Sequence, residues 1–461
     1  MDTRKKTILI KDADYIITMD ANKRILKRAS LFIEGSIIRE VNSKRTKADR
    51  VISARGKIVI PGFINCHHHM FQCMMRGMPE LQNQTIDRWI NIVCESTKKM
   101  DAETIYYSAL ANMAELLLYG CTTTTDMLYL FPKGKKGFFE TTIKAAKDIG
   151  IRFHPYRGSM SLSKKDGALF PDDVVQDSDT IASESEQMIR SYHDNSPESM
   201  LKIGLAPCTI FTSSAQDYKN AFSLSKRHGV NIQTHLSESE FENEYSVKKF
   251  HKRPLAYLGN LGWEGERVSF THCININAKE IKSLAATKTN VVHCPISNAR
   301  SPIGESGIAP VYEMLEQKVN VGIGVDGSAG NDSSNMLEEL RWARTMQGVR
   351  RESTYLKPET VFRMGTINGA RALNWESVIG SIEVGKASDI AIFSLDGVES
   401  AGACDPITAL LSTQARRANT VVVNGSVVVE HGRLLTISEE AIVKKTRLFQ
   451  KNHKGGCHAG E

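Results

Sequence analysis

The stretch Pro61-Gly62-Phe63-Ile64-Asn65-Cys66-His67-His68-His69 places two histidines, spaced i and i+2, at the end of a short apolar run. The run predicts a buried strand, and residues i and i+2 of a strand point to the same side. His67 and His69 can therefore face one metal ion. The other apolar runs of the chain decide which kind of sheet this strand joins.

Eight apolar runs alternate with amphipathic helical patterns between about residues 61 and 373. They centre on residues 62–66, 121–126, 150–156, 201–208, 230–236, 268–273, 290–295 and 320–326. Eight strands separated by helices predict an α/β fold, a parallel (β/α)8 TIM-like barrel, rather than an open sheet. One helix is expected near residues 101–119, where Asp101 can cap its start and Gly120 can stop it.

The two ends of the chain have a different sequence pattern. Residues 1–60 and 374–450 contain short alternating strand patterns, and Asn424-Gly425 between two Val-rich runs predicts a hairpin. Neither end has enough strands to be stable alone, so both are expected to form one small β-sandwich subdomain beside the barrel of residues 61–373. A C-terminal helix belongs to the second part, and residues 451–461 are expected to be a disordered tail.

Composition excludes several classes of protein. The 461 residues are 41% hydrophobic and 24% charged, which is typical of an ordinary soluble globular protein. The net charge of +7 is scattered, and the absence of a basic face interleaved with aromatics predicts no nucleic-acid partner. The chain contains no run of about eighteen apolar residues, so no membrane span is expected. Nine cysteines without C-x-x-C spacing favour a reducing, cytoplasmic setting with free thiols.

Three further polar residues close later apolar runs: His235, His272 and Asp326. Because the carboxyl ends of all strands meet at one mouth of such a barrel, these side chains are expected to converge with His67 and His69. Imidazoles and a carboxylate suit Zn²⁺, with Fe²⁺ or Mn²⁺ as alternatives. Each histidine alone could be an ordinary, partly buried residue, but the repetition at equivalent strand ends favours a metal site.

The fourth predicted strand bears on the number of metal ions. It ends in Leu205-Ala206-Pro207-Cys208, without the lysine or acid that a bridged two-metal site in such a barrel usually needs. Its lysine, Lys202, lies at the opposite end. One metal per chain is therefore predicted.

Glu238 follows the ligand candidate His235 by three residues, just past the strand. A carboxyl group there can lean over the metal and move a proton, with a pKa raised by burial. The alternative is a surface glutamate in an acidic loop. A second pattern, Gly322-x-Gly324-x-x-Gly327, formally matches a dinucleotide-binding fingerprint, but it falls in the eighth unit. These glycines are interpreted as close-packing positions.

The chain resembles the amidohydrolase superfamily, in its branch of aminohydrolases and chlorohydrolases, over nearly its whole length. The motifs that carry this are the first stretch above, Thr234-His235-Leu236-Ser237-Glu238, Thr271-His272-Cys273, His293-Cys294-Pro295-Ile296-Ser297-Asn298 and Gly324-Val325-Asp326-Gly327-Ser328. Within the branch it is most similar to 8-oxoguanine deaminases, with isoxanthopterin deaminases and triazine hydrolases close. Two departures lie near the expected pocket: Phe71 stands where a tyrosine is expected, and Cys73-Met74-Met75 replaces a more polar segment.

The resemblance implies roles for individual residues. The metal ligands would be His67, His69, His235 and Asp326, and the catalytic residues would be Glu238, His272 and Asp326. Gln72, Trp89 and Arg157 become candidate substrate contacts, by hydrogen bonding, by stacking and by pairing with a carbonyl group. For each of the three a purely structural role is the alternative, for Trp89 as a helix core residue and for Arg157 in an ion pair at the barrel mouth. His293 is a candidate for orienting the site.

The resemblance also implies a reaction. Hydroxide on the metal would attack a ring carbon of an amino-substituted nitrogen heterocycle, an 8-oxoguanine-type purine or a pterin, and ammonia would leave. The chain would then be a hydrolase acting on C–N bonds of cyclic amidines. The alternatives are a triazine hydrolase, removing chloride or an alkylamine at the same site, and a non-catalytic metal-binding barrel. A small heterocyclic substrate and a homo-oligomer, dimer or larger, are the expected partners.

Overall fold

The computed structural model describes residues 5–300, 307–351, 355–412 and 417–453. Its larger domain is built on eight parallel strands in sequential order. They are β6 (Phe63–Asn65), β7 (Cys121–Leu128), β8 (Arg152–Ser159), β9 (Gly204–Pro207), β10 (Ile232–Leu236), β11 (Val268–His272), β12 (Asn290–His293) and β13 (Val321–Ile323). The amide of Cys66, just after β6, donates to the carbonyl of Ile323 in β13, which brings the first and last strands together. The predicted barrel is confirmed.

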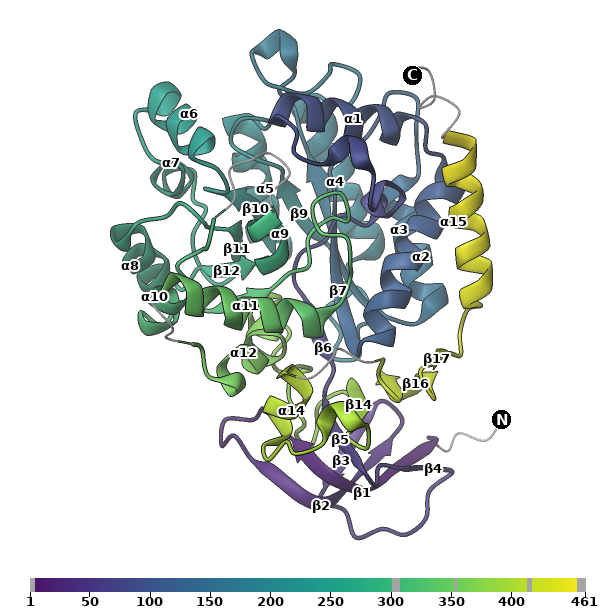
Figure 1. Cartoon of the computed structure of the whole chain (residues 1–461). Coiled ribbons are helices and arrows are strands. Elements are labelled where there is room, and N and C mark those ends of the chain that lie inside the picture. The colour runs from purple at the N-terminus through teal and green to yellow at the C-terminus, as the bar shows by residue number, and fades with distance from the viewer. Residues whose placement is uncertain (1–4, 301–306, 352–354, 413–416, 454–461) are drawn as a thin grey trace.

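Helices surround this sheet (Figure 1). They are α1 (Ile86–Lys98), α2 (Ala102–Leu118), α3 (Phe138–Ile149), α4 (Ser178–Tyr192), α5 (Ala215–His228), α6 (Glu240–Phe250), α7 (Pro254–Asn260), α8 (Ala278–Thr287), α9 (Pro295–Arg300), α10 (Val311–Glu316), α11 (Met336–Arg350), α12 (Pro358–Met364) and α13 (Ile367–Ala372), with short 3-10 turns η1 (Met70–Met75), η2 (Pro79–Leu81) and η3 (Lys164–Asp166). The predicted limits of α2 agree with the structure, because Asp101 accepts the amide of Thr104 as its cap. Among the described residues, no helix has the length and apolar character needed to cross a bilayer.

Both ends of the chain build the small β domain, as predicted. Its nine strands form one mixed sheet. They are β1 (Thr7–Ile17), β2 (Ile25–Glu34), β3 (Ile37–Val41), β4 (Arg50–Ser53), β5 (Lys57–Pro61), β14 (Ile390–Ser394), β15 (Thr420–Val423), β16 (Ser426–Glu430) and β17 (Arg433–Leu434). The β15–β16 hairpin turns at Asn424 and Gly425, whose φ values of 48° and 80° are those that a two-residue hairpin turn requires.

A buried ion pair ties the small domain to the barrel. Arg152, at the start of β8, donates from Nε and Nη2 to the carboxylate of Asp389, just before β14, at 2.8 and 3.1 Å. Both side chains are almost fully buried, so each charge is stabilised by the other and not by water. This bidentate pair is one of the contacts that join the two domains.

The C-terminal region contributes η4 (Val398–Ser400), α14 (Pro406–Ser412) and α15 (Glu439–His453). The last helix, yellow in Figure 1, runs along α2 on the outside of the barrel. The predicted tail of residues 451–461 is corrected at its start, because α15 continues to His453. The rest of that tail, residues 454–461, lies outside the described residues.

Candidate active site

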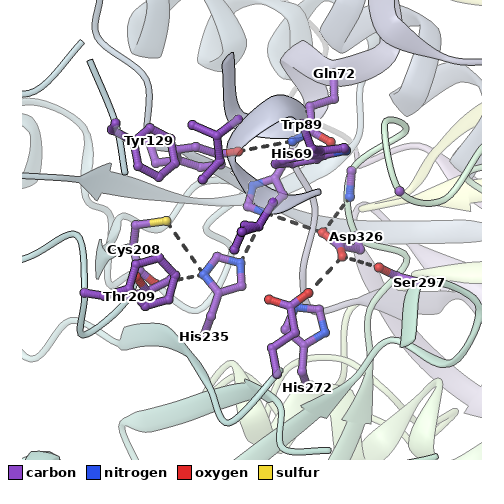
Figure 2. A pocket seen from close by; sticks show the side chains of 17 residues that line it. His69, Gln72, Trp89, Tyr129, Cys208, Thr209, His235, His272, Ser297 and Asp326 are labelled. Carbon is purple, nitrogen blue, oxygen red and sulfur yellow. Dashed lines mark hydrogen bonds and ion pairs between the residues drawn. The ribbon is translucent and has the colours of Figure 1, made fainter. Parts of the chain in front are cut away.

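The strand ends bring the predicted metal ligands together at one mouth of the barrel. Nε2 of His69 lies 3.3 Å from Nε2 of His235 and 3.4 Å from Oδ1 of Asp326, and Nε2 of His67 lies 3.5 Å from that same oxygen. Donor atoms about 2.05 Å from a tetrahedrally bound zinc stand about 3.3 Å apart. The spacing of this cluster, seen around His69 in Figure 2, therefore fits a single divalent ion.

The histidines are held in the tautomer that a metal needs. Each turns Nδ1 away from the cluster, where its N–H can donate to an oxygen: Gln233 Oε1 for His67 (2.7 Å), the Met127 carbonyl for His69 (2.8 Å) and the Cys208 carbonyl for His235 (2.8 Å). The lone pair of Nε2 then points inward. Nε2 of His67 is buried and has no hydrogen-bond partner, which is costly unless a ligand occupies the cluster.

Charge at the cluster also favours a cation. Burial lowers the pKa of His69 to about 3 and that of His235 well below its usual value, so both imidazoles are neutral. Burial opposes ionisation of Asp326, but its contacts with His67 and His272 outweigh this and hold its pKa well below the usual value. Ser297 donates to Asp326 Oδ2 at 2.5 Å, which fixes the carboxylate. Neutral imidazoles beside an anionic carboxylate are the donor set that zinc prefers.

Two catalytic candidates face this cluster. His272 Nε2 lies 3.8 Å from Glu238 Oε2 and 3.9 Å from Asp326 Oδ2. Burial raises the pKa of the Glu238 carboxyl group above its usual value. Burial lowers the pKa of His272, but the carboxylates of Glu238 and Asp326 reverse this and leave it raised. Glu238 thus lies beside His272 at the edge of the ligand cluster.

His272 is oriented from behind by Asn298, which the sequence analysis did not single out. The Nδ1–H of His272 donates to Oδ1 of Asn298 at 2.8 Å, and Nδ2 of Asn298 lies 3.4 Å from Nδ1 of His293. His293 does not line the pocket, so its place supports an orienting role. His272 and Asp326 have φ values of 73° and 64°, which are strained for residues with a side chain and typical of functional positions.

Glu238 is itself held by a second buried acid. Its backbone amide donates to Oε2 of Glu242 at 3.2 Å, and the side chain of Glu242 is fully buried with Oε1 unpaired. Burial raises the pKa of Glu242 from 4.5 to about 8. The folded protein therefore binds more protons than the unfolded chain between these values, and the free energy of unfolding falls as pH rises through that range.

Replacing Glu242 with glutamine is expected to remove this fall in the free energy of unfolding with rising pH. Between pH 5 and pH 8 the free energy of unfolding of the wild type should fall by at least about 1.4 kcal/mol more than that of the variant, the value of one pKa unit. Urea titrations at the two pH values measure it. The matched control is Glu244→Gln, which changes an exposed carboxylate on the same helix and should leave the pH dependence as in the wild type. Equal pH slopes for wild type and Glu242→Gln would contradict the assignment.

The pocket above the cluster has largely aromatic and apolar walls. Tyr129, Phe170 and Phe211 line it together with Trp89 from α1 and Gln72 from η1. Trp89 Nε1 is buried without a partner, so its N–H is available to a ligand. A side chain at Gly327 would have a Cβ 1.9 Å from Gln72 Oε1, so a glycine is required there for Gln72 to reach the site. Gln72 and Trp89 thus lie where a substrate would bind (Figure 2).

The structure does not bring Arg157 to this pocket. Its guanidinium donates through Nη2 to Glu184 Oε2 on α4 at 2.5 Å and lies over the ring of Phe131. Successive residues of a strand point to opposite sides. Arg157 therefore faces the helix layer, and we leave it out of the proposed substrate contacts. Cys73-Met74-Met75 are buried in η1 and also do not line the pocket.

Tyr129 is one of the pocket residues that the sequence analysis missed. The polar Asp126 appeared to end its strand, but Asp126 is buried, accepts the amide of Met70 at 2.8 Å, and β7 continues to Leu128. Tyr129 then follows directly, and its hydroxyl accepts an N–H from Gln72 at 3.2 Å. Phe71 packs edge-on against its ring. The hydroxyl expected at position 71 is therefore replaced by another that lies in the pocket.

Replacing Tyr129 with phenylalanine is expected to raise KM about threefold to tenfold with little change in kcat. With its oxygen occupied by Gln72, the O–H can donate to a substrate acceptor, and one neutral hydrogen bond contributes about 0.5–1.5 kcal/mol. Steady-state kinetics on the best substrate measure the effect. Tyr106→Phe, on α2 and outside the pocket, is the control and should match the wild type. An unchanged KM for Tyr129→Phe would remove Tyr129 from the substrate contacts.

Comparisons with known proteins agree with this geometry. Residues 58–428 match the model of the amidohydrolase family. The chain is 36% identical over 390 residues to an 8-oxoguanine deaminase from Pseudomonas aeruginosa, covering 85% of this chain and 86% of that protein. It is 30% identical to an isoxanthopterin deaminase from an unknown prokaryotic organism, covering 78% and 77%. The structure of an atrazine chlorohydrolase from Arthrobacter aurescens TC1 complexed with zinc superposes with a TM-score of 0.92 at 31% identity, covering 96% of this chain and all of that one. The chain therefore belongs to the amidohydrolase family.

Proposed function

We propose that the protein is a metal-dependent deaminase of an amino-substituted nitrogen heterocycle, of the 8-oxoguanine or pterin type. The observation that carries this proposal is the position of Glu238, whose carboxyl group lies 3.8 Å from His272 at the edge of the ligand cluster. Metal binding alone does not require such an acid. The proposal is supported by the 8-oxoguanine and isoxanthopterin deaminases among the relatives.

The pocket walls support a flat, uncharged ring as the substrate. Trp89, Tyr129, Phe170 and Phe211 offer aromatic surfaces, and no lysine or arginine is among the described residues that line the pocket. Stacking on aromatic side chains suits a heterocycle. Gln72, Tyr129 and Trp89 provide the few polar groups that would orient its ring atoms.

His67, His69, His235 and Asp326 would hold a divalent ion, which would supply Lewis acidity at the site when bound. Asp326 accepts a proton from the attacking water. Glu238 donates a proton to the ring nitrogen beside the attacked carbon, which makes that carbon more electrophilic. His272 donates a hydrogen bond to the oxygen as the C–O bond forms. The remaining O–H proton passes to Glu238 as a carbonyl forms, a proton reaches the amine from Glu238 or Asp326, and the C–N bond breaks to release ammonia.

A triazine hydrolase is the second candidate function. It is favoured by the close superposition with an atrazine chlorohydrolase complexed with zinc. The pocket's aromatic walls suit both ring classes. The two functions differ in the group that leaves, which is ammonia in one case and chloride or an alkylamine in the other.

The test is a panel assay of purified, zinc-loaded protein against 8-oxoguanine, isoxanthopterin, guanine, cytosine and hydroxylated or chlorinated triazines. Ammonia release from the purine or the pterin with kcat/KM above about 10⁴ M⁻¹s⁻¹ supports the deaminase. Release of chloride or alkylamine from a triazine, without ammonia from the other rings, would replace it with the second candidate.

The number of metal ions, the cellular location and the assembly are part of the same proposal. We infer one zinc per chain, because β9 ends in Pro207 and Cys208 rather than in an acid or a lysine. Two equivalents of metal, both required for activity, would contradict this. Eight cysteines of the described residues are free thiols, which supports a cytoplasmic location, and a homo-oligomer remains the expected assembly.

A further inference from the structure

A second cavity, of about 400 Å³, lies at the amino end of the barrel. Its walls come from the residues that precede three neighbouring strands, among them Lys202 before β9 and Arg267 before β11. His193 after α4 and Asn374 after α13 complete the rim. Because the ligand cluster stands at the carboxyl ends of the same parallel strands, this cavity is separate from the active site.

Hydrogen bonding leaves an excess of cationic donors in this cavity. Lys202 Nζ donates to the carbonyl of Asn374 at 3.1 Å, and Arg267 Nη1 donates to the carbonyl of Gly229 at 2.9 Å. Lysine carries three N–H donors and arginine five, so both have donors to spare. The side-chain N–H groups of Asn374 donate to Asn231 Oδ1 and to the Glu266 carbonyl, so they are already used.

The charges around the cavity are also unbalanced. Burial, with a further contribution from Arg267, lowers the pKa of Lys202 to about 8. His154 reaches the inner wall from β8, is almost fully buried, and has no hydrogen-bond partner on either ring nitrogen. Glu376 is the one carboxylate among the lining residues that the structure describes, and it is exposed. His154 is uncharged, because burial lowers its pKa well below the usual value, so an anion in the cavity would offset the positive charge of Lys202 and Arg267.

We propose that this cavity binds a phosphate group, free or as a small phosphomonoester, through Lys202 and Arg267. The volume admits a group larger than a single water, and the two cations precede β9 and β11, the strands on either side of β10. A compact ammonium and a planar guanidinium are the pair of side chains that commonly bind phosphate oxygens. This site is independent of the proposed deaminase activity, since none of its residues lines the active-site pocket.

Protection of Lys202 from chemical modification is the first test. The zinc-loaded protein is treated with a low concentration of acetic anhydride, with and without inorganic phosphate, at one ionic strength set with sodium chloride. Peptide mass spectrometry should show acetylation of Lys202 slowed about tenfold at ten times the Kd. Lys288, whose side chain is 74% exposed, should react at the same rate in both samples. Equal rates at Lys202 with and without phosphate would overturn the proposal.

Variants give the second test. Phosphate should raise the Tm of the wild type saturably, and Lys202→Met should abolish the rise while keeping basal activity and zinc content. Lys288→Met is the matched control and should respond like the wild type. Phosphate bound at the zinc would shift wild type and Lys202→Met alike, so an equal rise in both would sink the proposal. Repeating the titration with glycerol 3-phosphate shows whether the site prefers the free ion or the ester.

Discussion

Replacing Glu238 with glutamine is expected to lower kcat by about 10²–10⁴-fold while the protein keeps its metal. Glutamine has nearly the shape of glutamate, so the pocket is preserved, but its amide cannot deliver a proton to the ring nitrogen. The ligand atoms that lie close enough to share an ion belong to histidines and Asp326, not to Glu238. Steady-state kinetics and metal analysis on the same preparation separate the two effects.

Glu244→Gln is the matched control, since it neutralises an exposed acid six residues away and should retain wild-type kcat. A near wild-type kcat in Glu238→Gln would remove this residue from the mechanism. Loss of metal from Glu238→Gln would instead make it a ligand and would require a different proton donor. Both outcomes are distinguishable from a folding defect by comparing Tm values with those of the control.

The cluster of proposed metal ligands could be anticipated from the sequence because the barrel imposes a simple rule. Strands that are buried on both faces appear as continuous apolar runs, and a polar residue that closes such a run stands at the carboxyl mouth. His67, His235, His272 and Asp326 each close a run, and the structure places His235 in one close group with His67, and His272 and Asp326 in a second that shares His67. The rule depends on the backbone alone, so no knowledge of side-chain packing was needed.

The same rule failed where the direction of a side chain or the end of a strand depended on packing. Asp126 resembled the end of a strand, yet it is buried and bonded to the Met70 amide, so Tyr129 was overlooked. Arg157 lies in a strand near the mouth, but it faces α4, where Glu184 pairs with it. Phe170 and Phe211 reach the pocket from segments outside the barrel strands, and no periodicity marks such positions.

Replacing His67 with alanine is expected to abolish metal binding and with it the activity. His67 faces both His69 and Asp326, so its loss removes a ligand from the centre of the cluster. Removing a group that merely supports a ligand costs about 10–100-fold in metal affinity, and removing the ligand itself should cost more. Metal analysis after dialysis against a weak chelator should find about one zinc per wild-type chain and almost none in the variant.

Two further variants make this prediction sharp. Gln233→Met removes the acceptor that holds Nδ1 of His67 at 2.7 Å, so zinc affinity should fall by an intermediate factor of about 10–100. His154→Ala deletes another buried imidazole of the same barrel, lining the cavity at its amino end, and should lower Tm without loss of zinc. The order wild type, Gln233→Met, His67→Ala in zinc affinity follows from ligand geometry alone. Full zinc occupancy in His67→Ala would show that the ion is held elsewhere, and the mechanism built on this cluster would fall with it.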